Sequence, residues 1–373
     1  MEVHTQPSPR VSPFSERPVL VFWETTKACL LSCQHCRARA QREPLPGELT
    51  TTEGERLLED IARFGRPAPV VVFTGGDLLM RPDIFHLLDV ARTLGLRVAV
   101  SPSSTALLDD HTMSRFVTAG VQSLSLSLDG PEEIHDRIRG IPGTFASTLD
   151  AIRAARAAGL TVQINTVVMR DTVEHLPDVV SLLLRERVHV WEIFFLIATG
   201  RALADEYLEP EEWADVCDFL LDVSGYGLLV RAVEGPFIRR AQQERQAGVR
   251  VPGVLYRRLR VRLEDREGGP IRRPTITRTG TLDGDGIVFV THDGWITPGG
   301  FLPIRIGHVR QDQIAEVYRT HSLLIDIRQR RLHGPCGACS FIDVCGGSRA
   351  RSYAHGGDPL GSDPACQLAE IAI

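Results

Sequence analysis

The 373-residue sequence contains no long hydrophobic run and no excess of basic residues. No apolar stretch approaches the roughly 18 residues that a membrane-spanning helix needs, so we expect no membrane segment. The formal net charge of −5 favours neither nucleic acid nor an anionic membrane surface as a partner. Residues 1–18 are polar and proline-rich and lack the apolar core of a signal peptide, so we predict a flexible lead-in to a cytoplasmic protein.

Cysteine is present eight times, but its spacing does not indicate a disulfide-rich secreted protein. All but one of the cysteines fall in two tight groups, and the lone Cys217 is interpreted as a small buried hydrophobe. In a chain of this size without a signal peptide, such grouping favours metal binding over disulfides. The sequence also shows no internal repeat of the solenoid type. A metal-binding enzyme-sized protein of the cytosol is therefore expected.

The order of apolar segments is typical of an α/β fold with a parallel sheet. Runs rich in β-branched or aromatic residues alternate with segments of helical length, which is the pattern of successive βα units. We predict strands at residues 19–24, 70–73, 97–101, 121–128, 161–168 and 190–196. We predict helices near 51–64, 83–94, 109–119, 145–158 and 175–186, the first capped by Thr51 or Thr52. Six strands are enough for a partial barrel that is open on one side.

The first cysteine group, Cys29, Cys33 and Cys36, directly follows the first predicted strand. Three thiolates so close in sequence can converge on one metal centre. Zinc sites and closed iron–sulfur sites usually have four protein ligands, so three ligands indicate a cluster with one open iron. The loop would lie at the C-terminal end of a strand, where α/β enzymes place their chemistry. The alternatives are three buried structural thiols and a zinc site completed by a distant fourth ligand.

The C-x3-C-x2-C spacing after a first strand resembles the radical S-adenosylmethionine (radical SAM) superfamily, and His35 fits the aromatic residue usual before the last cysteine. The resemblance implies that Cys29, Cys33 and Cys36 hold a [4Fe–4S] cluster whose open iron binds S-adenosylmethionine (SAM). It also implies a partial (β/α)6 barrel and an electron donor such as flavodoxin or ferredoxin. The expected activity is reductive cleavage of SAM to methionine and a 5′-deoxyadenosyl radical, which abstracts hydrogen from a substrate.

Other residues at predicted strand ends are similar to the SAM-binding positions of that family. The turn after the second strand resembles the Gly-Gly-Glu-Pro-like turn that orients the amino group of SAM, although its proline is absent. Polar residues after the fourth strand and in the fifth resemble those that hold the ribose and the methionine carboxylate, and the turn after the sixth resembles the adenine side. Each of these positions also has a plain structural interpretation, as a turn or as a satisfied polar residue. The predicted cofactor contacts are His35, Thr74, Gly75, Gly76, Asp77, Ser127, Asp129, Asn165, Thr199 and Arg201.

Residues 250–278 are unusually basic, with nine arginines and only three acidic residues. The plain interpretation is a solvated basic loop. The alternative is that some arginines reach over the open barrel, because guanidinium groups bind carboxylate or phosphate in bidentate fashion. The arginines proposed for this role are Arg257, Arg258, Arg260, Arg272 and Arg273.

The second cysteine group consists of Cys336, Cys339, Cys345 and Cys366, and a predicted hairpin with an Asp-Gly turn at 293–294 precedes it. Four thiolates suit a closed [4Fe–4S] cluster, and structural zinc is the alternative. The surrounding sequence resembles the SPASM or twitch extension of radical SAM enzymes, in the branch with haem-pathway and haem d-type enzymes and the mycofactocin maturase. Cysteines of a second auxiliary cluster are absent near 283–286, at Gly299 and at Ser348. The resemblance therefore implies one auxiliary cluster, and two clusters in total.

The predicted organisation is a lead-in at 1–18, a barrel at 19–235, a basic linker or substrate-side segment at 236–285 and a cluster domain at 286–373. The resemblance favours a carboxylate-bearing substrate of tetrapyrrole or natural-product type, altered by decarboxylation, side-chain loss or bond formation. The second hypothesis is a ribosomal-peptide maturase that works with a separate peptide-binding partner. The third is a non-catalytic iron–sulfur carrier or scaffold, because fold-level analogy does not settle function.

Overall fold

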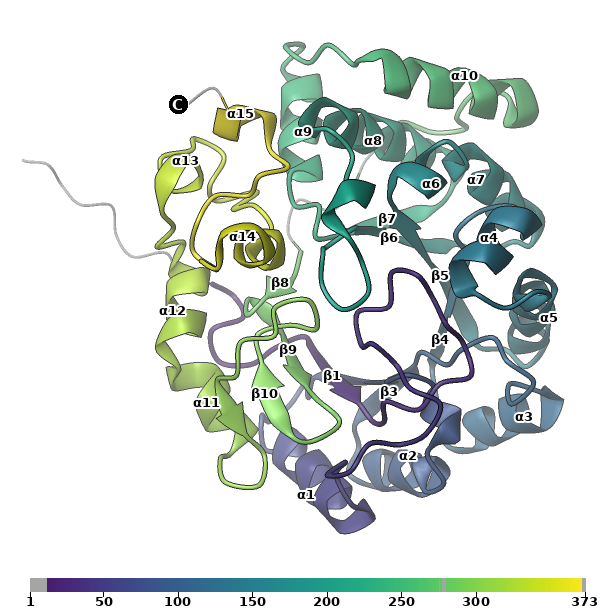
Figure 1. Ribbon diagram of the computed structural model, residues 1–373, viewed down its shortest axis with the longest axis vertical. Coiled ribbons are helices and arrows are strands. Elements are labelled where there is room, and N and C mark those ends of the chain that lie inside the picture. The colour runs from purple at the N-terminus through teal and green to yellow at the C-terminus, as the bar shows by residue number, and fades with distance from the viewer. Residues whose placement is uncertain (1–11, 275, 277–279, 371–373) are drawn as a thin grey trace, which may run out of the picture.

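Parallel strands form the frame of the fold (Figure 1). The computed structural model describes residues 12–274, 276 and 280–370. In this part of the chain, strands β1 to β7 follow one another in sequence order, and each is parallel to the next. They are β1 (Leu20–Glu24), β2 (Val70–Thr74), β3 (Arg97–Val100), β4 (Ser123–Ser127), β5 (Thr161–Val168), β6 (Val190–Phe195) and β7 (Leu229–Val233). The α/β fold class is confirmed, and β7 is an additional parallel strand that the sequence analysis missed.

Helices return the chain between the strands and cover the outside of the sheet (Figure 1). The capping residue of α1 is Thr50 and not Thr51 or Thr52, because its hydroxyl accepts a hydrogen bond from the Glu53 backbone N–H. The α-helices are α1 (Thr51–Ala62), α2 (Ile84–Thr93), α3 (Asp110–Thr118), α4 (Glu132–Arg139), α5 (Thr144–Ala157), α6 (Arg170–Val173), α7 (Leu176–Arg185) and α8 (Pro210–Val223). Short 3₁₀ turns lie at η1 (Leu78–Met80), η2 (Ala204–Glu206) and η3 (Ser224–Tyr226).

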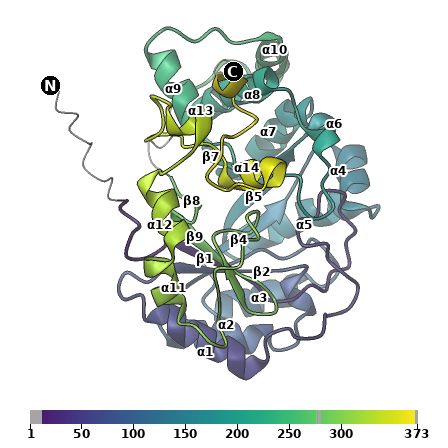
Figure 2. The same ribbon diagram turned by 60° about the vertical axis from the view of Figure 1, so that its left-hand side comes forward.

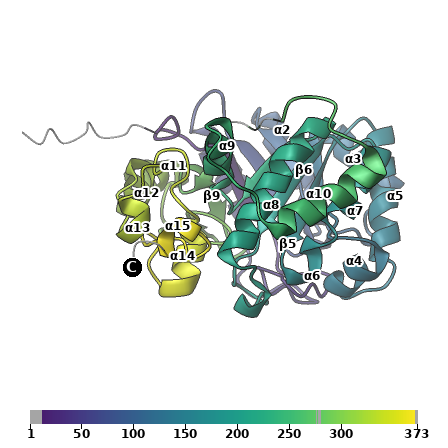
Figure 3. The same cartoon turned by 90° about the horizontal axis from the view of Figure 1, so that it is seen from above.

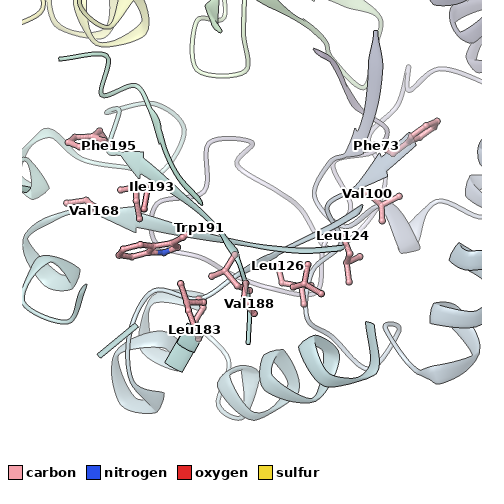
Figure 4. Packing of buried hydrophobic residues seen from close by; sticks show 14 of the residues in the cluster. Phe73, Val100, Leu124, Leu126, Val168, Leu183, Val188, Trp191, Ile193 and Phe195 are labelled. Carbon is pink, nitrogen blue, oxygen red and sulfur yellow. The ribbon is translucent and has the colours of Figure 1, made fainter. Parts of the chain in front are cut away.

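The core lies between the outer face of the strands and the surrounding helices (Figure 4). On β5, the buried side chains of Val162, Ile164 and Val168 alternate with positions such as Asn165 that face the inside of the barrel. Trp191 of β6 is fully buried in this outer layer, and its indole N–H donates to the Thr166 hydroxyl (2.9 Å). Because packing occupies the outer face, the inner face is left for the polar residues at the strand ends.

The sheet continues from β1 into the C-terminal region. Strand β9 (Gly286–Val290) lies parallel to β1, and β10 (Trp295–Thr297) pairs with β9 in antiparallel fashion, so the predicted hairpin is confirmed. Figure 2 shows the C-terminal helices along one side of the barrel. The remaining elements are β8 (Leu282–Asp283), β11 (Gly307–His308), α11 (Ile314–Thr320), α12 (Ser322–Gln329), α13 (Gly334–Gly337), α14 (Arg349–Gly356) and α15 (Gln367–Glu370). The predicted boundary at 285/286 thus falls within one continuous sheet.

The predicted flexible lead-in differs from the structure. Residues 1–11 lie outside the described residues, but the chain from Ser12 onward packs against the C-terminal region. Ser12 is buried and its hydroxyl donates to Asp285, while the backbone carbonyl of Phe14 accepts a hydrogen bond from the Tyr318 hydroxyl (2.8 Å). The prediction of flexibility is therefore wrong for residues 12–18.

The basic stretch forms a helix and not the predicted loop. After α9 (Ile238–Gln246), α10 (Val254–Glu267) packs across α7 and α8 on the outside of the barrel (Figure 3). Leu255, Leu259 and Leu263 are buried at four-residue spacing, which gives α10 an apolar stripe beneath its arginines. No described helix is long and apolar enough to cross a membrane.

Candidate active site

A cavity lies at the C-terminal ends of the parallel strands, under the loop that follows β1 (dark purple in Figure 1). It encloses about 1160 Å³ of empty space, part of it open to solvent. The sequence-predicted residues that line it are Cys29, Cys33, Cys36, His35, Thr74, Gly75, Gly76, Ser127, Asn165 and Arg201.

Two glycines allow the turn after β2 to approach the cysteine loop. A Cβ atom on Gly76 would lie 2.3 Å from the carbonyl oxygen of Ala28, and one on Gly75 would lie 2.7 Å from that of Thr26. The backbone N–H of Gly76 donates to the same Thr26 carbonyl (2.8 Å). No larger residue fits here without displacing the loop that presents Cys29.

Each thiol of the first cysteine group accepts a hydrogen bond from an N–H group. The pairs are Leu31 to Cys29 (3.3 Å), the Arg139 guanidinium to Cys33 (3.7 Å) and Ala40 to Cys36 (3.5 Å). Burial raises the pKa of the Cys29 and Cys33 thiols, so a bound metal would be needed to keep them as thiolates. Three thiolates with N–H donors at their sulfurs fit an iron–sulfur cluster, whose potential such hydrogen bonds tune.

Arg139 contacts this loop, and the sequence analysis did not single it out. Its guanidinium pairs with Asp129 (2.6 Å), and both side chains are buried. Burial opposes the charge on Asp129, but Arg139 lowers the pKa of that carboxyl, so it is ionised. Burial and the nearby Arg139 charge also lower the pKa of His35 to about 4, so its ring is neutral at physiological pH. A basic residue ending a helix just after Asp129 was the available sequence signal.

Three predicted cofactor contacts, Asp77, Asp129 and Thr199, do not line the cavity. The Asp77 carboxylate accepts hydrogen bonds from the Leu79 N–H (3.1 Å) and the Thr105 hydroxyl (3.3 Å), which braces the loop after β3. Burial raises its pKa to about 6. Asp77 and Asp129 support the cavity wall from behind, and a direct cofactor contact by these two residues or by Thr199 stays a prediction.

The turn after β6 holds the cysteine loop from the other side. Arg201 donates to the backbone carbonyls of Cys33 (2.8 Å) and Ala40 (3.2 Å), although it was predicted as an adenine-side residue. A Cβ atom on Gly200 would lie 2.3 Å from the carbonyl oxygen of Cys36, so this turn also requires glycine. None of the five arginines proposed to reach over the barrel lines the cavity, and α10, which carries three of them, packs against α7 and α8.

The second cysteine group lies in the loops around α13, α14 and α15, and each of its sulfurs also accepts an N–H hydrogen bond. The pairs are Asp363 to Cys336 (3.4 Å), Phe341 to Cys339 (3.4 Å), Gly347 to Cys345 (3.5 Å) and the Arg240 guanidinium to Cys366 (3.4 Å). Arg240 is only 3% exposed, so its charge is held inside the protein beside this group. Cys217 is fully buried, as predicted.

Neither cysteine group is arranged for a single ion. Among the described residues, no three His, Cys, Asp or Glu side chains are close enough together to hold one metal ion. A zinc ion needs its ligand atoms about 2.0–2.3 Å away, whereas a four-iron cluster spaces its thiolates more widely. The metal at each group therefore stays a prediction.

The three positions that lack the cysteines of a second auxiliary cluster lie close together in the structure. The Asp283 carboxyl packs against Gly299, where a Cβ atom would lie 1.8 Å from the nearest carboxyl oxygen. Asp283 is hydrogen-bonded to Glu234, which also accepts a hydrogen bond from the Ser348 hydroxyl. Protein side chains therefore fill the space between these positions.

Comparison with known proteins agrees with this geometry. The sequence profile of the radical SAM superfamily matches residues 23–183. The chain is 36% identical to an AdoMet-dependent heme synthase of Nitratidesulfovibrio vulgaris, across 93% of this chain and 91% of the relative. It is 28% identical to an Fe-coproporphyrin III synthase of Methanosarcina barkeri (96% and 90% covered) and 27% identical to the mycofactocin maturase MftC of Mycobacterium tuberculosis (97% and 87% covered).

The fold also matches a solved structure, that of Streptococcus suis SuiB bound to the precursor peptide SuiA. The TM-score is 0.70 at 15% sequence identity, and the match covers 94% of this chain and 76% of SuiB. At that identity the match supports the fold alone. The nearly full-length similarity to a haem synthase, together with the cysteine loop at the end of β1, establishes that the chain belongs to the radical SAM superfamily.

Proposed function

We propose that this radical SAM enzyme abstracts a hydrogen atom from a carboxylate-bearing side chain of a tetrapyrrole, which then loses the carboxylate. The observation that carries the proposal is the 36% identity, over nearly the whole chain, to an AdoMet-dependent heme synthase. Cys29, Cys33 and Cys36 would hold the [4Fe–4S] cluster that the superfamily implies. When bound, the cluster and SAM together supply the 5′-deoxyadenosyl radical, and the protein positions the reactants.

The charge of the cavity wall supports an anionic ligand. Among the described residues, the charged side chains that line it are Arg37, Arg139 and Arg201, of which Arg37 pairs with Glu24 and Arg139 with Asp129. Guanidinium groups in a partly enclosed cavity can bind and orient an anionic ligand. Ser127 and Asn165 are register partners on β4 and β5, so their side chains can serve one ligand together. We assign them to the ribose and methionine carboxylate of SAM.

We further propose one auxiliary [4Fe–4S] cluster at Cys336, Cys339, Cys345 and Cys366. The N–H donors at all four sulfurs support it, and the filled space at Gly299 argues against a second one. Its chemical role follows from electron balance. A propionate side chain that loses one hydrogen atom and CO₂ becomes a vinyl group and releases one electron, so an acceptor is required.

The test is an assay of the reconstituted protein under anaerobic conditions with SAM, dithionite and Fe-coproporphyrin III, a tetrapyrrole that carries propionates. We expect 5′-deoxyadenosine and a tetrapyrrole product with fewer carboxylates, both detected by mass spectrometry. The triple variant Cys29→Ala/Cys33→Ala/Cys36→Ala should form neither. If the wild type forms 5′-deoxyadenosine but leaves the tetrapyrrole unchanged, the substrate assignment is wrong while the radical SAM activity stands.

Peptide maturation is the second candidate, because the mycofactocin maturase is similar across 97% of this chain. In that case, turnover would require a precursor peptide and a peptide-binding partner, and Fe-coproporphyrin III would stay unchanged. An iron–sulfur carrier without catalytic activity would form no 5′-deoxyadenosine at all. The same assay therefore separates the three hypotheses. A flavodoxin or ferredoxin is proposed as the electron donor in place of dithionite.

A further inference from the structure

The cavity has two unlike ends. One end carries the cysteine loop and the glycine turn, and the other is apolar and has no role in SAM binding so far. The apolar end includes Phe194 from β6 and Phe301 from the loop between β10 and β11. Their ring centroids are 6.0 Å apart, with the ring planes tilted by 53°. The barrel and the C-terminal region thus contribute one ring each to a single aromatic wall.

Arg37 stands where the two ends meet. It directly follows Cys36, lines the cavity, and lies over the ring of Phe289, 4.6 Å from the ring centroid. Its guanidinium also donates to the backbone carbonyl of Gly300 (3.3 Å), next to Phe301. One side chain therefore connects the cysteine loop with the loop that presents the aromatic wall.

Arg37 shares its carboxylate partner with other basic side chains. Glu24 pairs with Arg37 (3.0 Å), but the same carboxylate also faces Lys27 (3.8 Å) and His292 (3.0 Å). Burial raises the pKa of Glu24, but these neighbours together bring it down to about 2, so it carries one full negative charge. Asp283 also interacts with Arg37, but burial raises the pKa of that carboxyl, so Glu24 is the carboxylate that pairs with Arg37 directly. The Arg37 side chain is 20% exposed and lines the cavity, so its guanidinium is accessible to a ligand.

We propose that Arg37, Phe194 and Phe301 form the substrate subsite of the cavity. A flat conjugated ring system packs against the two phenyl groups, and one of its carboxylates pairs with the Arg37 guanidinium. Because Arg37 directly follows Cys36, a carboxylate held there places the attached side chain beside the cysteine end of the cavity, where SAM would bind. This inference rests on the proposed function and names the residues that would give it substrate specificity.

The test is equilibrium binding to the reconstituted holoenzyme of two probes, Fe-coproporphyrin III and its tetramethyl ester, followed by porphyrin absorbance. Arg37→Gln removes the charge that distinguishes the acid from the ester. Arg305→Gln is the matched control, because Arg305 also lies over an aromatic ring (Trp295, 4.4 Å) but does not line the cavity. Phe301→Leu removes a ring of the subsite, and Phe85→Leu on α2 is its control.

We expect Arg37→Gln to weaken binding of the acid about tenfold, as loss of a charge-assisted hydrogen bond does, and to leave binding of the ester nearly unchanged. Phe301→Leu should weaken both probes by a similar factor, and the two controls should bind like the wild type. Iron content and far-UV circular dichroism identify any variant that fails to fold. If the Arg37→Gln variant fails to fold, the comparison of Phe301→Leu with Phe85→Leu tests the proposal by itself.

Two results would overturn the subsite. Equal affinity of wild type and Arg37→Gln for the acid, or an equal loss in Arg305→Gln, removes the role of Arg37 and leaves the proposed function intact. Absence of any porphyrin binding by a wild-type protein that still cleaves SAM overturns the tetrapyrrole assignment, and the subsite falls with it.

Discussion

Asp129 is a buried charge behind the cavity wall that a single arginine balances. It is fully buried and ionised, and it pairs with Arg139, which also reaches Cys33. Arg139, which donates to the Cys33 sulfur, is thus held by the Asp129 carboxylate, which does not line the cavity. This two-step support resembles the outer shell of other metal sites, where partners behind the ligands fix their orientation.

We predict that Arg139→Gln destabilises the fold by about 3–5 kcal/mol, because it leaves the Asp129 carboxylate buried without its partner. Arg137→Gln is the control, since Arg137 pairs with Asp171 at the surface and such a pair contributes about 0–1 kcal/mol. Urea unfolding of both variants measures the difference. Equal urea midpoints for the two variants would show that the buried pair contributes no more stability than the surface pair.

The Glu234–Asp283 pair predicts a pH dependence of stability. Burial raises the pKa of both carboxyls, so the folded protein holds a proton that the unfolded chain releases near pH 4. The unfolding free energy should therefore fall as the pH rises above about 4, by at most about 1.4 kcal/mol per pH unit for each proton. Asp283→Asn keeps the shape of the side chain but does not titrate, so the unfolding free energy of this variant should fall less as the pH rises. Parallel pH profiles of urea midpoints for the two proteins would contradict the assignment.

Helix α10 is held to the barrel by charges that come from distant parts of the chain. Arg258, Arg262 and Arg266 lie at four-residue spacing on one face and pair with Glu174 and Asp178. Arg262 contacts both carboxylates, so it is the centre of this network. The network gives these three arginines a structural role on the outside of the barrel.

We predict that Arg262→Ala lowers the unfolding free energy by about 1 kcal/mol at low salt, because partly exposed ion pairs contribute little each. The loss should shrink in about 1 M NaCl, where screening is strong. Arg257→Ala is the control, since Arg257 donates to the carbonyl of Pro252 near the start of its own helix. Both variants should cleave SAM at the wild-type rate. A loss of porphyrin binding in either would restore a substrate role for this helix.

The comparison of α10 with β2 shows which elements the sequence could reveal. Strand β2 is a short apolar run, and such runs are recognisable without knowledge of their neighbours. In α10, arginines obscure the apolar stripe of Leu255, Leu259 and Leu263, and the carboxylates that pair with them lie about 80 residues earlier. The candidate site follows the same rule. The cysteine spacing and the glycine turn can be recognised from neighbouring residues in the sequence. The roles of Arg139 and Arg37 depend on partners that lie on other elements.

Over the whole molecule, the barrel and the C-terminal region each contribute one ring to the aromatic wall of the cavity. The barrel provides the cysteine end of the cavity, and the C-terminal region provides Phe301 and the second cysteine group. Under the proposed function, such a division would separate radical formation from electron removal. The two cysteine groups should therefore be separable by mutation.

We predict that Cys345→Ala lowers the iron content of the reconstituted protein from about eight to about four per chain, as loss of one four-iron cluster requires. Dithionite-driven formation of 5′-deoxyadenosine should continue, because Cys345 does not line the cavity. Formation of the decarboxylated product should stop, since the electron released with CO₂ has no acceptor. Cys217→Ala is the matched control, because Cys217 is at least as buried but belongs to neither group. Product formation by Cys345→Ala at the wild-type rate would show that the second group serves only to hold the C-terminal region in place.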